Sequence, residues 1–235
     1  MNATPSSLTP QPVDATFLED VLQGLSAPVK HLHPKYFYDA AGSRLFDRIC
    51  ELPEYYLTRT ELDIMSRHAP DMGAAVGPGA LLVEPGSGSS VKIRLLLDAL
   101  ERPAGYVPVE ICQEHMETSA AELQRDYPRL DIRPVCADFT QPFPVPEGRT
   151  RPRRRLVYFP GSTLGNFPPA EAGRLLSNLH EVAGTGGALL LGVDLIKDAS
   201  VLEPAYDDGQ GITAAFNLNL LRRINRELGA DFALD

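Results

Sequence analysis

Cysteine, long apolar runs and basic charge are all scarce in this 235-residue chain. Its three cysteines, Cys50, Cys112 and Cys136, are too few and too scattered for a disulfide framework or a zinc cluster. The pair His31 and His33 has no evident third ligand, so we expect no metal site. No apolar run reaches the length of a membrane span, and the start of the chain lacks the pattern of a secretory signal. We therefore expect a cytoplasmic protein with no membrane partner.

The charge balance also argues against nucleic acid and membrane lipid as partners. With 22 Lys and Arg against 31 Asp and Glu, the net charge is -9, which disfavours non-specific binding to nucleic acid or anionic lipid. The one basic block, residues 149–155, lies between Pro-rich segments, and we interpret it as a solvated loop rather than a phosphate site. A composition of 43% hydrophobic and 23% charged residues is typical of a globular protein of one large or two small domains.

The first part of the chain is predicted to be helical. Residues 1–15 are polar and Pro-rich, and we expect them to be disordered. A helix then begins at Thr16, with Thr16 as its cap and Glu19 as the capping-box partner. Two more helices are expected over residues 43–51 and 58–68.

From residue 80 onward, strands alternate with helices. The expected strands are residues 80–83, 105–111, 132–135, 155–159 and 188–193, and the expected helices are residues 92–100, 114–126, 169–183 and 212–228. This alternation is typical of βαβ units, so the sequence predicts an α/β fold with a parallel sheet.

Candidate ligand-binding residues follow the first three strands, where parallel sheets bind their ligands. Gly86 and Gly88 follow the first strand, and glycine lets the backbone turn tightly and approach a ligand. Glu110 lies at the end of the second strand, 22 residues after Gly88, where its carboxylate can accept both hydroxyls of a ribose. Asp138 follows the third strand and can accept from an adenine amino group, with Phe139 near the ring.

These residues favour one adenosine cofactor over another. A lone Gly-x-Gly is also compatible with a plain tight turn, and an acid after the second strand serves NAD as well as S-adenosylmethionine. However, residue 91 is Val, so the third glycine of a dinucleotide fingerprint is missing. Together with Asp138, this favours an S-adenosylmethionine-dependent methyltransferase and disfavours an NAD-dependent oxidoreductase.

Longer motifs carry a resemblance to one family. From about residue 30 to its end, the chain resembles the histidine Nα-methyltransferases, which form hercynine for ergothioneine biosynthesis. The motifs are Tyr36-Phe37-Tyr38-Asp39, Gly42-Ser43-x-Leu45-Phe46, Leu52-Pro53-Glu54-Tyr55-Tyr56-x-Thr58-Arg59-x-Glu61, Gly86-Ser87-Gly88-Ser89, Gly161-Ser162-Thr163-Leu164-Gly165-Asn166, Asp194-Leu195-Ile196-Lys197-Asp198 and Ala214-Ala215-Phe216-Asn217-Leu218-Asn219.

The resemblance implies a Rossmann-like class I methyltransferase core with a mostly helical substrate-binding domain. The core would span residues 61–197, and the substrate domain would combine residues 16–60 with an insertion that begins in residues 198–235. By resemblance, the residues that contact S-adenosyl-L-methionine are Tyr38, Gly86, Lys92, Glu110, Asp138 and Phe139, and those that contact L-histidine are Tyr56, Asn166 and Tyr206.

The implied chemistry suits these residue types. A neutral amine attacks a sulfonium methyl group without a covalent enzyme intermediate, so positioning and desolvation dominate. Asn166 offers amide donors and a carbonyl acceptor, Tyr206 can donate to the substrate carboxylate, and Tyr56 can reach the imidazole directly or through water. Its neighbour Tyr55 leaves open which of the two tyrosines packs in the core. We name no general base, because an α-amine titrates near neutrality.

The sequence departs from the family pattern in three places. Pro85 stands where an apolar residue such as Leu is usual, and Glu110 replaces the commoner Asp. Family members also continue for several dozen residues, which supply an acid and a serine to the histidine pocket and the last strands of the core. We therefore expect residues 188–193 to form an open edge, and the 235-residue chain to be a marginally stable monomer with weak or no activity.

Two alternatives stay open. The chain could methylate another amino acid or an indole amine, or it could be a non-catalytic remnant that binds the cofactor or a partner chain.

Overall fold

The computed structural model describes residues 14–88 and 90–234 and contains one parallel sheet with the strand order β3-β2-β1-β4-β5. All four pairings between neighbouring strands are parallel, which confirms the predicted α/β fold. The strands are β1 (Ala80–Pro85), β2 (Gly105–Glu110), β3 (Val135–Cys136), β4 (Arg154–Phe159) and β5 (Ala188–Leu191).

The central strand β1 determines where a ligand can bind. Every residue of β1 is buried, as expected for a strand covered on both faces. Val83 pairs with Val107 of β2 on one side and with Val157 of β4 on the other. The chain therefore leaves β1 toward one edge of the sheet and returns for β4 on the other side, and this switch opens a crevice at the carboxyl ends of the two strands.

The third strand is shorter than predicted. Ile132 makes only an isolated bridge with Tyr106, and the ladder resumes at Val135. Pro134 lies between them and has no N–H to donate, so the pairing is interrupted there.

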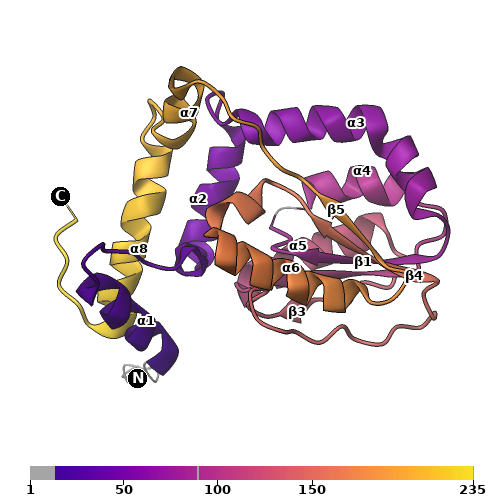
Figure 1. Cartoon of the computed structure of the whole chain (residues 1–235), viewed down its shortest axis with the longest axis horizontal. Coiled ribbons are helices and arrows are strands. Elements are labelled where there is room, and N and C mark those ends of the chain that lie inside the picture. Colours follow the sequence, from indigo (N-terminus) through magenta and orange to yellow (C-terminus); the bar gives the residue numbers. More distant parts are fainter. Residues whose placement is uncertain (1–13, 89, 235) are drawn as a thin grey trace, which may run out of the picture.

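Four helices cover the two faces of the sheet (Figure 1). They are α3 (Tyr56–Val76), α4 (Val91–Ala99), α5 (Gln113–Asp126) and α6 (Pro169–Ala183). Side chains of α3, α4 and α5, among them Met65, Leu96 and Leu123, pack on one face. Leu175 and Leu179 of α6 pack on the other.

Helix α3 is longer than the predicted 58–68. It begins at Tyr56 and continues through Pro70 to Val76. At Gly73 a Cβ would collide with the carbonyl oxygen of Ala99, so this glycine lets α3 lie close against the end of α4. The predicted domain boundary between residues 60 and 61 falls inside this helix.

The first helix has a different cap from the predicted one. Helix α1 (Ala15–Ser26) is capped by Asp14, whose carboxylate accepts from Thr16 N at 3.0 Å and Phe17 N at 3.2 Å. The Thr16 cap with its Glu19 partner was therefore wrong, since Thr16 lies in the first turn. Of the segment predicted to be disordered, Asp14 and Ala15 belong to this ordered helix start, and residues 1–13 lie outside the described residues.

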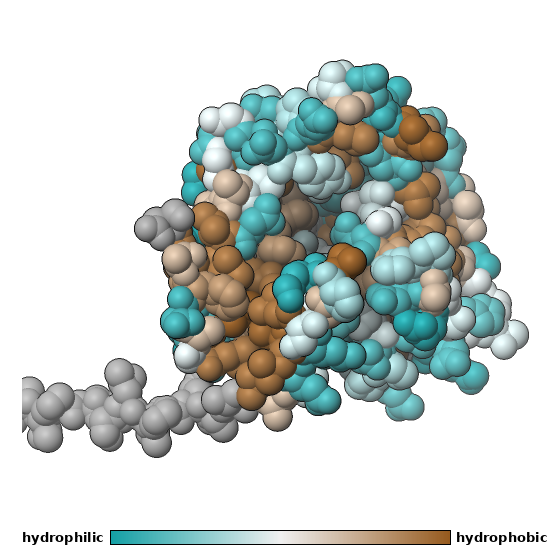
Figure 2. Space-filling model, turned by 60° about the vertical axis from the view of Figure 1, so that its left-hand side comes forward, coloured by the Kyte–Doolittle hydropathy of each residue, from teal (hydrophilic) through white to brown (hydrophobic). Residues whose placement is uncertain are grey.

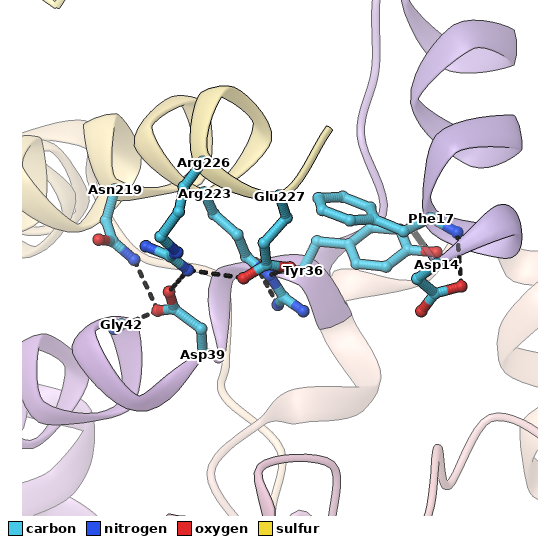
Figure 3. A network of polar contacts seen from close by, with 9 residues as sticks. All are labelled: Asp14, Phe17, Tyr36, Asp39, Gly42, Asn219, Arg223, Arg226 and Glu227. Carbon is cyan, nitrogen blue, oxygen red and sulfur yellow. Dashed lines mark hydrogen bonds and ion pairs between the residues drawn. The ribbon is translucent and has the colours of Figure 1, made fainter. Parts of the chain in front are cut away.

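A second group of helices, the helical cluster, brings together the first and last helices of the described residues. It consists of α1, the 3₁₀ helix η1 (Pro34–Phe37), α2 (Ala40–Glu51), α7 (Ala199–Tyr206) and α8 (Ile212–Leu228). Helix α8 lies beside α2 and η1 and shares one apolar core with Ile49 and another with Phe17 (Figure 1). Arg223 of α8 also donates to the Tyr36 carbonyl at 3.1 Å (Figure 3).

On the side of the molecule that carries the helical cluster, the surface contains both hydrophilic and hydrophobic side chains (Figure 2). Apolar side chains gather in a patch there, beside a hollow.

Within residues 14–88 and 90–234, no helix is both long enough and apolar enough to cross a membrane.

Two arginines of the basic block have structural partners. Arg154 donates to the carbonyls of Ala75 and Val76 at the end of α3, at 3.3 and 3.1 Å. Arg155 donates to the Val182 carbonyl near the end of α6 at 3.0 Å. For these two residues the interpretation as a solvated loop was wrong, because they satisfy carbonyls that a helix leaves free at its C-terminus.

Candidate active site

The turn after β1 is built on glycines. Gly86 and Gly88 have φ angles of +70° and +48°, in the left-handed region that favours glycine. A Cβ at Gly86 would lie 3.2 Å from Cε1 of Phe139, so the glycine keeps open the space beside that ring. Phe139 also packs edge-on against Phe159, with ring centroids 5.6 Å apart. Two residues predicted to contact one cofactor thus meet at the switch point, whereas Ser89 of the same motif lies outside the described residues.

Glu110 is oriented by backbone donors. Its side chain is buried at the end of β2, where Oε1 accepts from Ile111 N at 2.8 Å and Oε2 accepts from Gly88 N at 3.3 Å. Cys112 N also donates to Oε1, at 3.4 Å, so three of about four acceptor positions are used, two of them by long bonds that ligand hydroxyl groups can replace. The bond from Gly88 N joins the glycine turn to the acid of the neighbouring strand.

Asp138 has partners that the sequence did not reveal. Its Oδ1 accepts from Thr140 N at 2.9 Å and from Thr140 Oγ1 at 2.6 Å. Its Oδ2 lies 3.3 Å from Nζ of Lys35, which is also 3.4 Å from Asp20. Lys35 belongs to η1, so an ion pair connects the helical cluster to the loop after β3.

Tyr38 follows η1 and points into an aromatic group. Its ring meets Phe46 of α2 and Phe216 of α8 edge-on, with centroids 5.6 and 5.7 Å apart. Burial raises the pKa of the Tyr38 hydroxyl well above its usual value, and the negative charge of Glu110 raises it further. The hydroxyl therefore stays protonated at neutral pH.

Lys92, on the first turn of α4, is paired with a carboxylate that sequence reasoning did not single out. Its Nζ lies 2.6 Å from Oε2 of Glu61, which comes from α3. Glu61 also accepts a hydrogen bond of 2.9 Å from Gly161 N, in the loop after β4. Glu61 stands at the end of the Leu52–Glu61 motif, which was the available signal.

One predicted histidine-binding residue, Tyr56, contacts Asp194, which follows β5. The Tyr56 hydroxyl donates to the Asp194 carboxylate, and Lys197 pairs with the same carboxylate while its Nζ lies 4.8 Å from the Tyr56 ring centre. Burial and the hydrogen bond to Asp194 raise the pKa of Tyr56. Tyr206 is 56% exposed, and both burial and the charge of Asp194 raise its pKa. Tyr55 is the member of the adjacent pair that packs in the core.

Asn166 lies at the end of η2 (Thr163–Asn166), a short 3₁₀ helix after β4. It is exposed, and among the described residues no hydrogen bond joins it to Tyr56 or Tyr206. The loops after β4 and β5 are nevertheless connected, because Ser162 Oγ accepts from Asp194 N at 3.0 Å. This bond links the turn that leads to Asn166 with Asp194, the partner of Tyr56, whereas Tyr206 lies at the end of α7 and takes no part in it.

A cavity of about 220 Å³ lies between α3 and the ends of β4 and β5. Tyr56, Glu61 and Asp194 contribute its polar wall, and apolar residues such as Met65 and Leu190 contribute the rest. The cavity thus adjoins both Glu61, the partner of Lys92, and the pair formed by Tyr56 and Asp194.

Together, these features define a class of protein. The sheet order reverses beside β1, a glycine turn lies at that point, and acids follow β2 and β3, as in α/β enzymes that bind an adenosine cofactor. The residues fit such a group, because Gly86 leaves open the space that a Cβ would fill beside Phe139, and Glu110 and Lys92 offer partners for hydroxyls and for a carboxylate.

The chain belongs to the family of histidine-specific, S-adenosylmethionine-dependent methyltransferases, whose family model matches residues 17–235. It is 46% identical over 220 residues to the histidine N-alpha-methyltransferase of Mycolicibacterium smegmatis, covering 92% of this chain and 67% of that protein. The Mycobacterium tuberculosis protein of the same name is 44% identical over the same shares. Ergothioneine biosynthesis protein 1 of Neurospora crassa is 32% identical over 82% of this chain and 22% of its own length.

Proposed function

We propose that this protein transfers methyl groups from S-adenosylmethionine to the α-amino group of L-histidine, ending at the trimethylated betaine hercynine. The observation that carries the proposal is the match to the family over residues 17–235, together with 46% identity to a histidine N-alpha-methyltransferase. The bound cofactor supplies an electrophilic methyl group on a positively charged sulfur.

On the cofactor side of the site, six residues contact different parts of S-adenosylmethionine. Glu110 accepts the two ribose hydroxyls, and Lys92 faces the carboxylate of the methionyl end. Asp138 shares its carboxylate between Lys35 and the adenine amino group. The other contacts come from Gly86, whose backbone approaches the ligand, and from Tyr38 and Phe139.

The substrate side uses Tyr56, Asn166 and Tyr206. The Tyr56 hydroxyl uses its only O–H in the hydrogen bond to Asp194. Its oxygen can therefore only accept, and we assign it to an N–H group of the imidazole ring. Tyr206 and Asn166 orient the amino-acid end of histidine. Since no general base is assigned, these residues act by orienting the amine and by excluding water from it.

The two sides correspond to two parts of the chain. Residues 61–197 form a class I methyltransferase core. Residues 16–60 and 198–235 form a substrate-binding domain, which is the role we assign to the helical cluster. The enzyme acts as a cytoplasmic monomer.

The test is an assay of the purified chain with S-adenosylmethionine and L-histidine, read as S-adenosylhomocysteine release and as mass of the methylated amino acid. Trimethylhistidine, formed at a low rate, is the expected product, and the blocked amine N-acetylhistidine should give none. Methylation of tryptophan in place of histidine would identify a different acceptor. Binding of S-adenosylhomocysteine by calorimetry without any turnover would identify a cofactor-binding remnant.

A further inference from the structure

Glu61 reaches from the substrate side of the site to the cofactor side. It lies on α3, five residues after Tyr56, and its side chain is only 17% exposed. Its carboxylate lies where β4 and β5 end, next to the cavity described above.

Both oxygens of this carboxylate are used. Gly161 N donates to Oε1 at 2.9 Å and to Oε2 at 3.1 Å, and Lys92 Nζ lies 2.6 Å from Oε2. Gly161 opens the turn that continues through Ser162 into η2 and ends at Asn166. One side chain therefore contacts the lysine of the cofactor side and the loop that carries a residue of the substrate side.

The neighbouring strand leaves room for this carboxylate. A Cβ at Gly192, directly after β5, would collide with Oε1 of Glu61, and it would also lie 3.2 Å from Gly161 N. Gly161 itself has a φ of +78°, which favours glycine. A glycine thus follows each of the adjacent strands β4 and β5 at the point where the Glu61 carboxylate lies.

The ion pair directs the remaining donors of Lys92. An ammonium group has three N–H donors and no acceptor, so a bond to Glu61 leaves two for a ligand carboxylate. The Lys92 side chain is 21% exposed, and a partly buried charge-assisted pair holds its geometry better than a solvated one. Without Glu61, Lys92 would regain rotamer freedom, and Gly161 N would lose its acceptor.

We propose that Glu61 is a positioning residue for methyl transfer, which fixes Lys92 and the turn from Gly161 to Asn166 relative to each other. It thereby fixes the position of the cofactor relative to the substrate amine. This inference rests on the proposed function only for the roles of Lys92 and Asn166.

The test compares Glu61→Gln with Asp63→Asn. Asp63 is an exposed acid on the same helix, paired with Arg67 one turn along, so its variant is the matched control. For each chain, calorimetry gives the Kd of S-adenosylhomocysteine, thermal unfolding gives Tm, and the histidine assay gives kcat and KM. Glu61→Gln should raise the Kd about tenfold and lower kcat by at least as much, with a Tm close to that of Asp63→Asn.

A double variant separates positioning from general packing. If Glu61 acts through Lys92, adding Glu61→Gln to Lys92→Gln should weaken S-adenosylhomocysteine binding no further than Lys92→Gln alone. Gly192→Ala, which displaces the carboxylate without removing it, should reproduce the raised Kd. Three outcomes would each overturn the proposal. They are a wild-type Kd and kcat in Glu61→Gln, additive losses in the double variant, and a Glu61→Gln chain that does not fold. The calorimetric measurement does not depend on the acceptor, so failure of histidine methylation in the wild-type chain would count against the proposed function alone.

Discussion

Asp39 and Asn219 lie 180 residues apart in the sequence, and the Asn219 amide donates to Asp39 Oδ1 at 2.8 Å (Figure 3). The same oxygen caps α2 by accepting from Gly42 N at 2.7 Å, and Oδ2 accepts from Arg226 at 2.6 Å. One carboxylate therefore joins the start of α2 to α8 and connects three of the family motifs. The preceding residue, Tyr38, places its ring against Phe46 of α2 and Phe216 of α8, the same two helices.

Replacing Asp39 with Ala should destabilise the protein by about 2–4 kcal/mol. The variant loses a helix cap and two further hydrogen bonds, and it leaves the buried Asn219 amide without this partner. Urea unfolding followed by circular dichroism measures the loss, and Asp207→Ala, an exposed acid outside this network, is the control. Equal stability of the two variants would contradict the assigned role.

The same network should contribute to acid sensitivity. Burial raises the pKa of Asp39, but the hydrogen bonds from Gly42 N, Arg226 and Asn219 outweigh it, so the pKa lies below its usual value. The stabilisation is therefore present above the unfolded-state pKa of about 3.9 and is lost as the pH falls through the lower folded-state pKa. Asp39→Asn should be less stable than the wild type at pH 6, and the difference should shrink below about pH 4.

Glu84 should give the opposite pH dependence. Burial raises the pKa of this β1 carboxyl to about 8, although the hydrogen bond from Tyr106 lowers it. Between the unfolded-state pKa of about 4.3 and the folded-state value, the unfolded chain releases a proton that the folded chain keeps, so stability falls as pH rises. Glu84→Gln removes this titration, and its stability relative to the wild type should increase from pH 5 to pH 8 in urea unfolding. A difference that does not change with pH would show that Glu84 is ionised in the folded protein.

Gly86→Ala should weaken cofactor binding. The substitution places a Cβ 3.2 Å from Phe139 at a φ of +70°, which costs about 1–2 kcal/mol in backbone strain and displaces the ring. Calorimetry should show a Kd for S-adenosylhomocysteine raised about tenfold or more. The matched control is Gly173→Ala, because Gly173 lies within α6 with open space around its Cα. That variant should gain about 0.5–1 kcal/mol in stability and bind the ligand normally.

Tyr56→Phe should affect histidine and not the cofactor. The variant keeps the ring under Lys197 and loses the hydroxyl that donates to Asp194. We expect KM for histidine to rise about tenfold while the Kd for S-adenosylhomocysteine stays unchanged. Tyr127→Phe removes a comparable hydroxyl, bonded to Asp98 at 2.7 Å on a different part of the molecule, and should change neither constant.

The sequence predicted the sheet well because its strands are short apolar runs bounded by glycine or proline. It failed where a local signal was ambiguous, as at Pro134, which interrupts the third strand, and at Pro70, which α3 passes through. It also placed the first cap at Thr16, since Asp14 and Thr16 are both good caps and only the structure shows which one is used.

The candidate site was predictable as far as strand order determines it. The carboxyl ends of β1, β2 and β3 meet at one edge, so Gly86, Glu110 and Phe139 were expected to lie together. The ion pair of Lys92 with Glu61 and the bond of Tyr56 to Asp194 join residues 31 and 138 positions apart on different elements. Periodicity describes single elements, and it carries no information on which polar groups of two elements will meet.

The split origin of the helical cluster has a consequence for biosynthesis. Phe17 and Tyr36 are made early, but the core that buries them needs Leu220 and Ile224 of α8, which leave the ribosome after all five strands. At about 5–20 residues per second, the N-terminal helices stay without this partner for on the order of ten seconds or more. The sheet can therefore assemble first, and the N-terminal segment packs against α8 last, with its apolar side chains accessible to chaperones in the meantime.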